Sequence, residues 1–335
     1  MSRIKSILSF ILIGVLCASC INAGRTIHKP QDYAWVLATA SPENTVTGIF
    51  ATVFADKVNE LSDGKMQIKV YHNSVLGGDT ELFESCQAGD IPFVVQNTAP
   101  EVSYLPQLCL FDLPCVFSNL DQLHQVLDQP AFMQEVNGIY QSGGFRLLAM
   151  ADQHFRVMTS NKPIQELKDL KGIKIRTMEN SYHMAFWSRF GTNPTPMAFA
   201  ELYVGLEQHM VDAQENPYEV ICSNGFYEVQ KYVVETNHLP HLLALITNND
   251  FYNSLPESQQ AVIDQAASYA RDYARAQAIE RSNSRIEEIR AHGTEVISIS
   301  DAMRAQLREA ADPVFQQIRS VVANEQLFNT YCSPK

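Results

Sequence analysis

Two stretches of the chain alternate strand-like and helix-like segments, and this alternation restricts the fold more than any other feature. In residues 34–96 an apolar run, a helical stretch, an alternating run, a second helical stretch and another apolar run follow one another. Residues 171–232 show a similar order and include a helix that begins at Pro217. Such alternation predicts parallel sheets covered by helices. We therefore predict an α/β protein with two lobes.

A long helical segment follows at residues 256–291, rich in the strong helix formers Ala, Gln, Arg and Glu. At 1.5 Å per residue it would reach about 50 Å if unbroken, which exceeds the width of a small domain. We expect it to connect the two lobes, because leucine is absent from the seam that a coiled coil would need. A last helix is predicted after Ser300, its N-cap. The 335 residues also favour two domains over one core.

The first 23 residues have the layout of a secretory signal peptide. Arg3 and Lys5 precede an apolar run at residues 7–17, which is too short to span a membrane, and small residues follow. Cleavage after Ala23 would release a soluble periplasmic protein, and this is the prediction. Cleavage before Cys20 would instead leave a lipid-bearing cysteine. A buried N-terminal helix is disfavoured, because the run has no amphipathic period.

Charge and motifs exclude several classes of function. The formal net charge is −12, from 25 basic and 37 acidic residues, which argues against nucleic acid as a partner. Small anions must therefore be bound at local arginines. The chain has no Gly-x-Gly-x-x-Gly or Walker motif, so no nucleotide cofactor is expected.

The histidines are scattered and the cysteines show no zinc spacing, so no metal site is predicted. Of the seven cysteines, five lie beyond Ala23, and Cys109 and Cys115 are close enough in sequence to form a disulfide. Buried free thiols are the favoured interpretation. Cys222 and Ser223 lack a neighbouring base or a nucleophile-elbow motif, so we predict no catalytic residue.

Ligands of open parallel sheets bind at the carboxyl ends of strands, and several polar residues are predicted there. Arg176 ends one strand, where an arginine can hold a carboxylate with two parallel hydrogen bonds; a surface salt bridge is the alternative. Arg156 begins a strand where the chain would pass between lobes. Asn216 precedes Pro217 and is predicted to cap the next helix while its amide faces the cleft. Asp79 opens a helix after two glycines.

Several motifs, in order, resemble those of one known family: VYHNSVLGG, RVMTSNKPI, DLKGIKIRTMEN, GTNPTPMAFAELYVGLE, VDAQENP and FYEVQKYV. Over residues 33–330 the chain is similar to the DctP-type substrate-binding proteins of tripartite ATP-independent periplasmic (TRAP) transporters. The resemblance implies a two-lobed, type II-like periplasmic-binding-protein fold whose lobes are joined by crossing strands and a long helix. Lobe I would comprise residues 32–153 and 241–281, and lobe II residues 154–240 and 282–330.

The same resemblance implies a monomeric binding protein that closes on an organic acid and delivers it to a sodium-driven membrane permease. The family's selectivity arginine corresponds to Arg176. The other cleft positions correspond to Arg156, Asn216, Phe199 and Asp79. Sialate-binding members carry Asn, Glu and Arg where this chain has Ala40, Asn97 and Pro100, which counts against sialate.

The remaining polar candidates suit hydroxyl groups better than a second carboxylate. They are Gln96, Asn97 and Thr98 after an apolar run, and Glu179. His183, one helical turn after Glu179, is a further candidate for the cleft, although a surface histidine is the favoured interpretation. We therefore predict a sugar acid, an aldonate or uronate, as the ligand. A C4-dicarboxylate, with Arg156 at its far end, is the alternative. An exported sugar-acid enzyme and a sensor that presents the bound acid to a receptor are alternatives from other classes.

Overall fold

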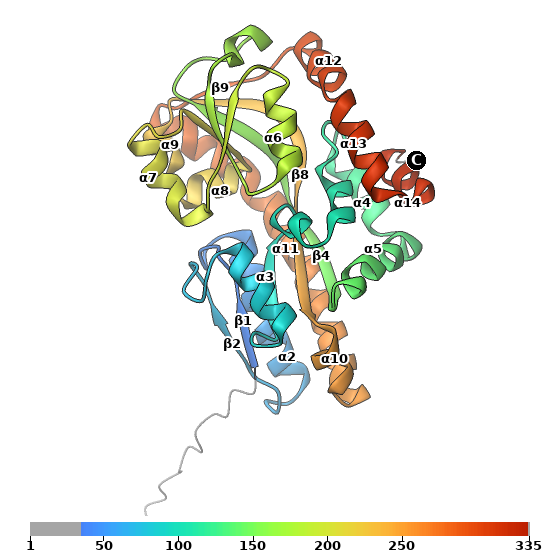
Figure 1. The fold of residues 1–335 in the computed structure, drawn as a ribbon. Helices are drawn as coiled ribbons and strands as arrows, with labels where there is room; N and C mark the ends of the chain where they lie inside the picture. Colours follow the sequence, from blue (N-terminus) through green and yellow to red (C-terminus); the bar gives the residue numbers. More distant parts are fainter. Residues whose placement is uncertain (1–34, 334–335) are drawn as a thin grey trace, which may run out of the picture. The chain divides into compact units, whose positions relative to one another are not determined.

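The computed structural model of the protein describes residues 35–333 (Figure 1). The predicted signal peptide and Cys20 lie outside these residues. Within residues 35–333, no helix combines the length and the apolar character needed to cross a membrane.

Nine strands form one sheet in the order β2-β1-β3-β8-β4-β7-β5-β6, with β9 paired to β8. Their bounds are β1 (Trp35–Ala38), β2 (Ile68–Tyr71), β3 (Phe93–Asn97), β4 (Phe145–Ser160), β5 (Lys174–Thr177), β6 (Asn193–Pro196), β7 (Ala213–Asn216), β8 (Tyr232–Asn248) and β9 (Glu295–Ile297). β1 pairs in parallel with β2 and β3, and β5 pairs in parallel with β6 and β7. Both predicted parallel groups are therefore confirmed.

The long strands β4 and β8 join these two groups. They contain 16 and 17 residues and pair in antiparallel fashion, with β3 on the outer edge of β8 and β7 on that of β4. Their pairing shifts register at three places, near Leu147–Ala149, Asp152–Phe155 and Arg156–Met158, and such irregularities bend and twist a strand. The two-lobed α/β fold is confirmed. The residue boundaries of the lobes stay a prediction.

Helices cover the sheet (Figure 1). They are α2 (Val46–Leu61), α3 (Asp79–Ala88), α4 (Leu120–Leu127), α5 (Pro130–Ser142), α6 (Ser181–Ser188), α7 (Leu202–Glu207), α8 (Tyr218–Ser223), α9 (Phe226–Val229), α10 (Asn249–Ser254), α11 (Glu257–His292), α12 (Asp301–Ala310), α13 (Asp312–Val322) and α14 (Glu325–Cys332), with short 3-10 turns η1 (Pro100–Ser103), η2 (Pro106–Asp112), η3 (Leu167–Leu170) and η4 (Phe199–Glu201).

Two predicted helices are each divided in two. The helix expected after Pro217 ends at Ser223, and Gly225, whose φ of 66° is left-handed, separates α8 from α9. The last helix begins after Ser300, which caps it as predicted, but it breaks at Ala311. Pro313 follows the break and cannot donate a backbone hydrogen bond to the preceding turn.

The long helix is confirmed as α11, with 36 residues. Ala266, Ala270, Ala274 and Ala278 are buried at four-residue spacing, so the helix backbone can lie close to its neighbours. α11 contacts α2 and β4 along one part and α8, α9 and β9 along another. It therefore spans both lobes, as expected.

A buried glutamate behind the sheet predicts a pH dependence of stability. Glu101 accepts hydrogen bonds from Gln96 Nε2 at 3.2 Å and from the Tyr140 hydroxyl at 2.5 Å. Burial raises its pKa from 4.5 to about 8. The folded state thus keeps a proton that the unfolded state loses. The stabilisation is complete below pH 4.5 and disappears as the pH rises towards 8.

We expect Glu101→Gln to remove this dependence. Between pH 4.5 and pH 8, the unfolding free energy of the wild type should fall by on the order of 5 kcal/mol relative to that of the variant. Urea unfolding at closely spaced pH values measures both curves, and Glu135→Gln on the exposed face of α5 is the control. Parallel curves for wild type and Glu101→Gln would contradict the prediction.

Candidate functional site

Two adjoining cavities of about 260 Å³ and 30 Å³ lie at the carboxyl ends of the parallel strands. Both are lined by Ala40, Asp79, Arg176, Met178 and Phe199, and we call them together the cleft. The position agrees with the rule that open α/β sheets bind ligands beyond their strand ends. Of the predicted binding residues, those lining the cleft are Asp79, Asn97, Arg176, Glu179, Phe199 and Asn216.

Arg176 lies near the end of β5 and is only 2% exposed. Its Nε and Nη2 donate to the carbonyl oxygen of Met197 at 3.0 and 2.7 Å. Nη1 is buried, with no hydrogen-bond partner among residues 35–333. The edge formed by Nη1 and the second hydrogen of Nη2 can therefore take both oxygens of a carboxylate. Burial and the charge of Arg156 lower the pKa of Arg176 to about 10, so it stays cationic at neutral pH.

Acidic side chains line the cleft around this single arginine. Asp79 begins α3, and burial raises its pKa to about 6 although Arg176 opposes the shift. Glu179 accepts a hydrogen bond from the Thr80 hydroxyl at 3.3 Å. Glu81 and Glu201 also line the larger cavity. These carboxylates can accept hydrogen bonds from ligand hydroxyls, whereas a second ligand anion would be repelled.

Two asparagines line the smaller cavity. Asn97 accepts from the Ala99 amide at 2.8 Å and donates to the Leu242 carbonyl at 2.9 Å. Asn216 donates to Gln214 Oε1 at 2.7 Å. The predicted helix cap is wrong: Pro217 occupies the N-cap position of α8, and no side chain caps it. Asn216 is the last residue of β7, so its side chain is held by the strand and not by the helix.

Arg156 lies outside the cleft lining, behind it. The side chain is 1% exposed and pairs with the buried carboxylate of Glu215, with Nη2 2.9 Å from Oε1. It also donates to Nδ1 of His241, which does line the cleft. Burial alone would raise the pKa of Glu215, but Arg156 and His183 hold it well below its usual range. The charge of Arg156 is therefore neutralised inside the protein.

His241 is a cleft residue that the sequence prediction missed. Burial and Arg156 lower its pKa well below the usual range, so the ring is neutral. Because Nδ1 accepts from Arg156, the hydrogen must be on Nε2, and the ring can donate to a ligand. Its sequence context, a lone histidine in the apolar run PHLLAL, gave no sign of this role. In the smaller cavity, the other lining residues that were missed are Ser41, Thr47, Met178 and Val220.

Besides Arg156, three further predicted residues, Gln96, Thr98 and His183, lie outside the cleft lining. Side chains alternate along β3, so Gln96 points away from Asn97 and contacts Glu101. The buried Thr98 donates its backbone amide to the Leu242 carbonyl at 3.3 Å. His183 is buried with Nε2 2.9 Å from Asp112 Oδ1. Burial alone would lower its pKa, but Asp112 and Glu215 raise it to about 9.

Two further predictions concern metal binding and the state of the cysteines. No group of metal-ligating side chains occurs in residues 35–333. Cys109 and Cys115 are free thiols, as are Cys86, Cys222 and Cys332. The favoured interpretation, buried free thiols, holds for Cys86, Cys109 and Cys222, whereas Cys115 and Cys332 are only half-buried.

Comparison with known proteins gives one family. The family model for bacterial extracellular solute-binding proteins of family 7, DctP, matches residues 37–320. The 2,3-diketo-L-gulonate-binding periplasmic protein YiaO of Escherichia coli (strain K12) is 32% identical over 269 residues, 78% of this chain and 81% of YiaO. The ectoine-binding periplasmic protein TeaA of Halomonas elongata is 32% identical over 264 residues, 78% of this chain and 77% of TeaA.

Solved structures agree with the sequence comparison. A TRAP periplasmic solute-binding protein from Polaromonas sp. JS666, bound to D-erythronate, superposes with a TM-score of 0.85 at 30% identity. The match covers 90% of this chain and 99% of that one. These three proteins have three different ligands, so the ligand of this chain must be inferred from its own cleft.

Proposed function

This chain belongs to the DctP family of TRAP-transporter solute-binding proteins, and we propose that it captures a polyhydroxylated monocarboxylate, an aldonate or uronate, for a membrane permease. One observation carries the choice of ligand. The unpartnered edge of Arg176 is the only free guanidinium edge among the residues that line the cleft, and carboxylates surround it.

The binding mode follows from these groups. The ligand carboxylate takes two charge-assisted hydrogen bonds from Arg176, each contributing about 1.5–3 kcal/mol. Asp79, Glu179 and the donor edge of His241 bind the hydroxyls. A micromolar dissociation constant corresponds to about −8 kcal/mol, which two such bonds and a few hydroxyl contacts can supply.

A C4-dicarboxylate is the weaker candidate. It needs a second cation, and Arg156, the group expected to supply one, is paired with Glu215 behind His241. Its far carboxylate would meet Asp79 and Glu179 instead. Like charges in such a site repel each other strongly.

A thermal-shift screen of the exported protein tests this function. We expect D-galactonate, D-gluconate and D-glucuronate to include stabilising ligands, and succinate and L-malate to have no effect at equal concentration. A ligand at 100 times its dissociation constant adds about 2.7 kcal/mol to the unfolding free energy. Stabilisation by the dicarboxylates alone would overturn the proposed ligand class but not the family.

Asp79→Asn separates the two ligand classes further. The variant should bind a sugar acid about tenfold more weakly, because a neutral amide accepts hydroxyl hydrogen bonds less strongly than a carboxylate. A dicarboxylate should bind it more tightly than the wild type. Isothermal titration measures both affinities, and Glu84→Gln, on the exposed face of the same helix, should change neither. Tighter sugar-acid binding by Asp79→Asn would contradict the role of Asp79.

Binding without turnover is part of the proposal. The relatives are solute-binding proteins, which supports binding without turnover. Mass spectrometry of the acid after prolonged incubation with purified protein should recover it unchanged. Appearance of a product would support the exported enzyme instead. The sensor alternative predicts a membrane receptor as the binding partner where transport predicts a permease, and pull-down with the ligand-loaded protein distinguishes them.

We also propose a periplasmic location, reached through a signal peptide at residues 1–23. Intact mass measurement of the exported protein distinguishes cleavage after Ala23 from cleavage before Cys20 with lipid attached. The family is extracytoplasmic, which supports export but leaves the form of the N-terminus to this measurement.

A further inference from the structure

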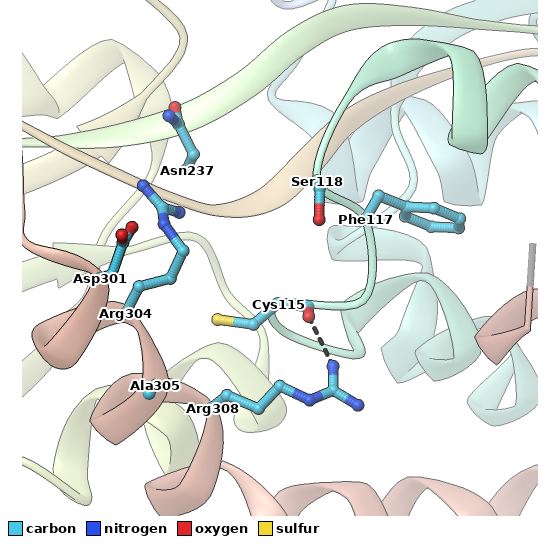
Figure 2. Close-up of a pocket in the computed structure, with 8 residues that line it drawn as sticks. All are labelled: Cys115, Phe117, Ser118, Asn237, Asp301, Arg304, Ala305 and Arg308. Carbon is cyan, nitrogen blue, oxygen red and sulfur yellow. Dashed lines mark hydrogen bonds between the residues drawn. The ribbon is translucent and has the colours of Figure 1, made fainter.

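Figure 2 shows a second pocket, of about 480 Å³. It shares no lining residue with the cleft. It is formed by the loop after η2, the bend of β8 and the first turns of α12. We call it the α12 pocket, and its lining is Cys115, Phe117, Ser118, Asn237, Asp301, Arg304, Ala305 and Arg308.

Two arginines one helical turn apart give this pocket its charge. Arg304 Nη1 donates to the Thr236 carbonyl at 3.3 Å, and Arg308 Nη1 donates to the Cys115 carbonyl at 2.5 Å. Arg308 also lies over the ring of Phe315. Neither arginine forms an ion pair within residues 35–333, although Asp301 lies in the same pocket. Arg304 and Arg308 place two positive charges in a pocket whose lining has one carboxylate, that of Asp301, so an anion between the two guanidinium groups would be stabilised.

The side chain of Cys115 lies in the α12 pocket near the charges of both Arg304 and Arg308. Its side chain points into the region between Arg304 and Arg308 (Figure 2). Burial raises the pKa of its thiol to about 11, and the charges of Arg308 and Arg304 act against that rise. The pocket volume is also within the range of small-molecule sites, about 300–1,000 Å³.

We propose that the α12 pocket is a second anion site, which binds a small ligand bearing a phosphate or carboxylate group between Arg304 and Arg308. Guanidinium groups form paired hydrogen bonds with either kind of oxyanion. The Ser118 hydroxyl points towards the pocket and can add a further donor (Figure 2). This site stands on its own geometry and does not depend on which acid the cleft binds.

The position of the site connects it to the crossing strands. The Cys115 amide donates to the His238 carbonyl at 2.7 Å, and Arg304 contacts Thr236 two residues earlier on β8. The regular pairing of β4 with β8 is interrupted at this segment, because the register passes from Arg156↔Leu239 directly to Met158↔Val234. An anion that draws the guanidinium groups away from these carbonyls would therefore act where the two lobes are joined.

Labelling of Cys115 with N-ethylmaleimide tests the site directly. A Cys332→Ser background removes the other half-buried thiol. We expect inorganic phosphate or citrate, at ten times its dissociation constant, to slow labelling about tenfold, since only about one site in ten is then free. Sodium chloride of equal ionic strength is the reference. If phosphate protects Cys115 at a lower concentration than citrate does, the ligand carries a phosphate group. If citrate protects at the lower concentration, the ligand is a polycarboxylate.

Variants make the result specific. Arg304→Gln with Arg308→Gln should abolish protection, whereas Arg290→Gln on exposed α11 and Arg176→Gln in the cleft should retain it. Equal labelling rates in phosphate, citrate and chloride would overturn the proposal. So would protection that survives in the double variant, because the anion would then act elsewhere. Circular dichroism of the double variant confirms that it is folded.

Discussion

Arg176→Lys should weaken binding of the sugar acid about 100-fold or more. The wild-type guanidinium is fixed by two hydrogen bonds to the Met197 carbonyl, so its other edge is already oriented for a carboxylate. A lysine ammonium keeps the charge but cannot present two parallel donors, and it must also satisfy the carbonyl that Arg176 leaves. Losing one or two charge-assisted bonds of about 1.5–3 kcal/mol gives an effect of this size.

Isothermal titration with the acid found in the thermal-shift screen measures the change. Arg189→Lys, at the exposed end of α6, is the matched control and should bind like the wild type. Circular dichroism should show that both variants are folded. An Arg176→Lys affinity equal to that of the wild type would mean that the carboxylate is held elsewhere, and the proposed binding mode would be wrong.

The sequence predicted the parts of the fold that depend on neighbouring residues. The strands before and after α3, the left-handed glycine at its end and the long α11 all follow from local periodicity, propensity and capping. Arg176 could be placed at a strand end for the same reason. The orientation of the Arg176 side chain could not be predicted, because it depends on a hydrogen bond to the Met197 carbonyl, 21 residues further along the chain.

Arg156 shows why other predictions were incomplete. Its environment is created where β4 pairs with both β7 and β8, which brings Glu215 and His241 to it from distant parts of the chain. The pairing of β4 with β8 includes three register shifts that no local pattern encodes. A one-residue difference in register would turn the side chain to the other face of the sheet. Position in the sequence therefore placed Arg156 on a strand between the lobes, but it predicted neither the burial of its side chain nor its pairing with Glu215.

Glu215→Gln should be strongly destabilising, by about 3–5 kcal/mol, because it leaves buried positive charge without its partner. Glu215 is fully buried against Arg156, with His238 Nε2 3.0 Å and His183 Nδ1 3.6 Å from its carboxylate. A glutamine preserves the shape of the side chain and one hydrogen-bond acceptor. The decrease in unfolding free energy therefore results mainly from the missing negative charge. Urea denaturation of the ligand-free protein measures it, provided that the slopes of the transitions are equal.

A second variant separates charge from packing. Arg156→Gln combined with Glu215→Gln removes both members of the pair, and it should be less destabilised than Glu215→Gln alone, because no unpaired guanidinium remains. The exposed pair of Arg290 and Glu287 provides the comparison, and Glu287→Gln should cost less than about 1 kcal/mol. If Glu215→Gln proved as mild as Glu287→Gln, the Arg156 charge would have to be solvated in the folded protein. Arg156 would then be available to the cleft, and the argument against a dicarboxylate ligand would lose its basis.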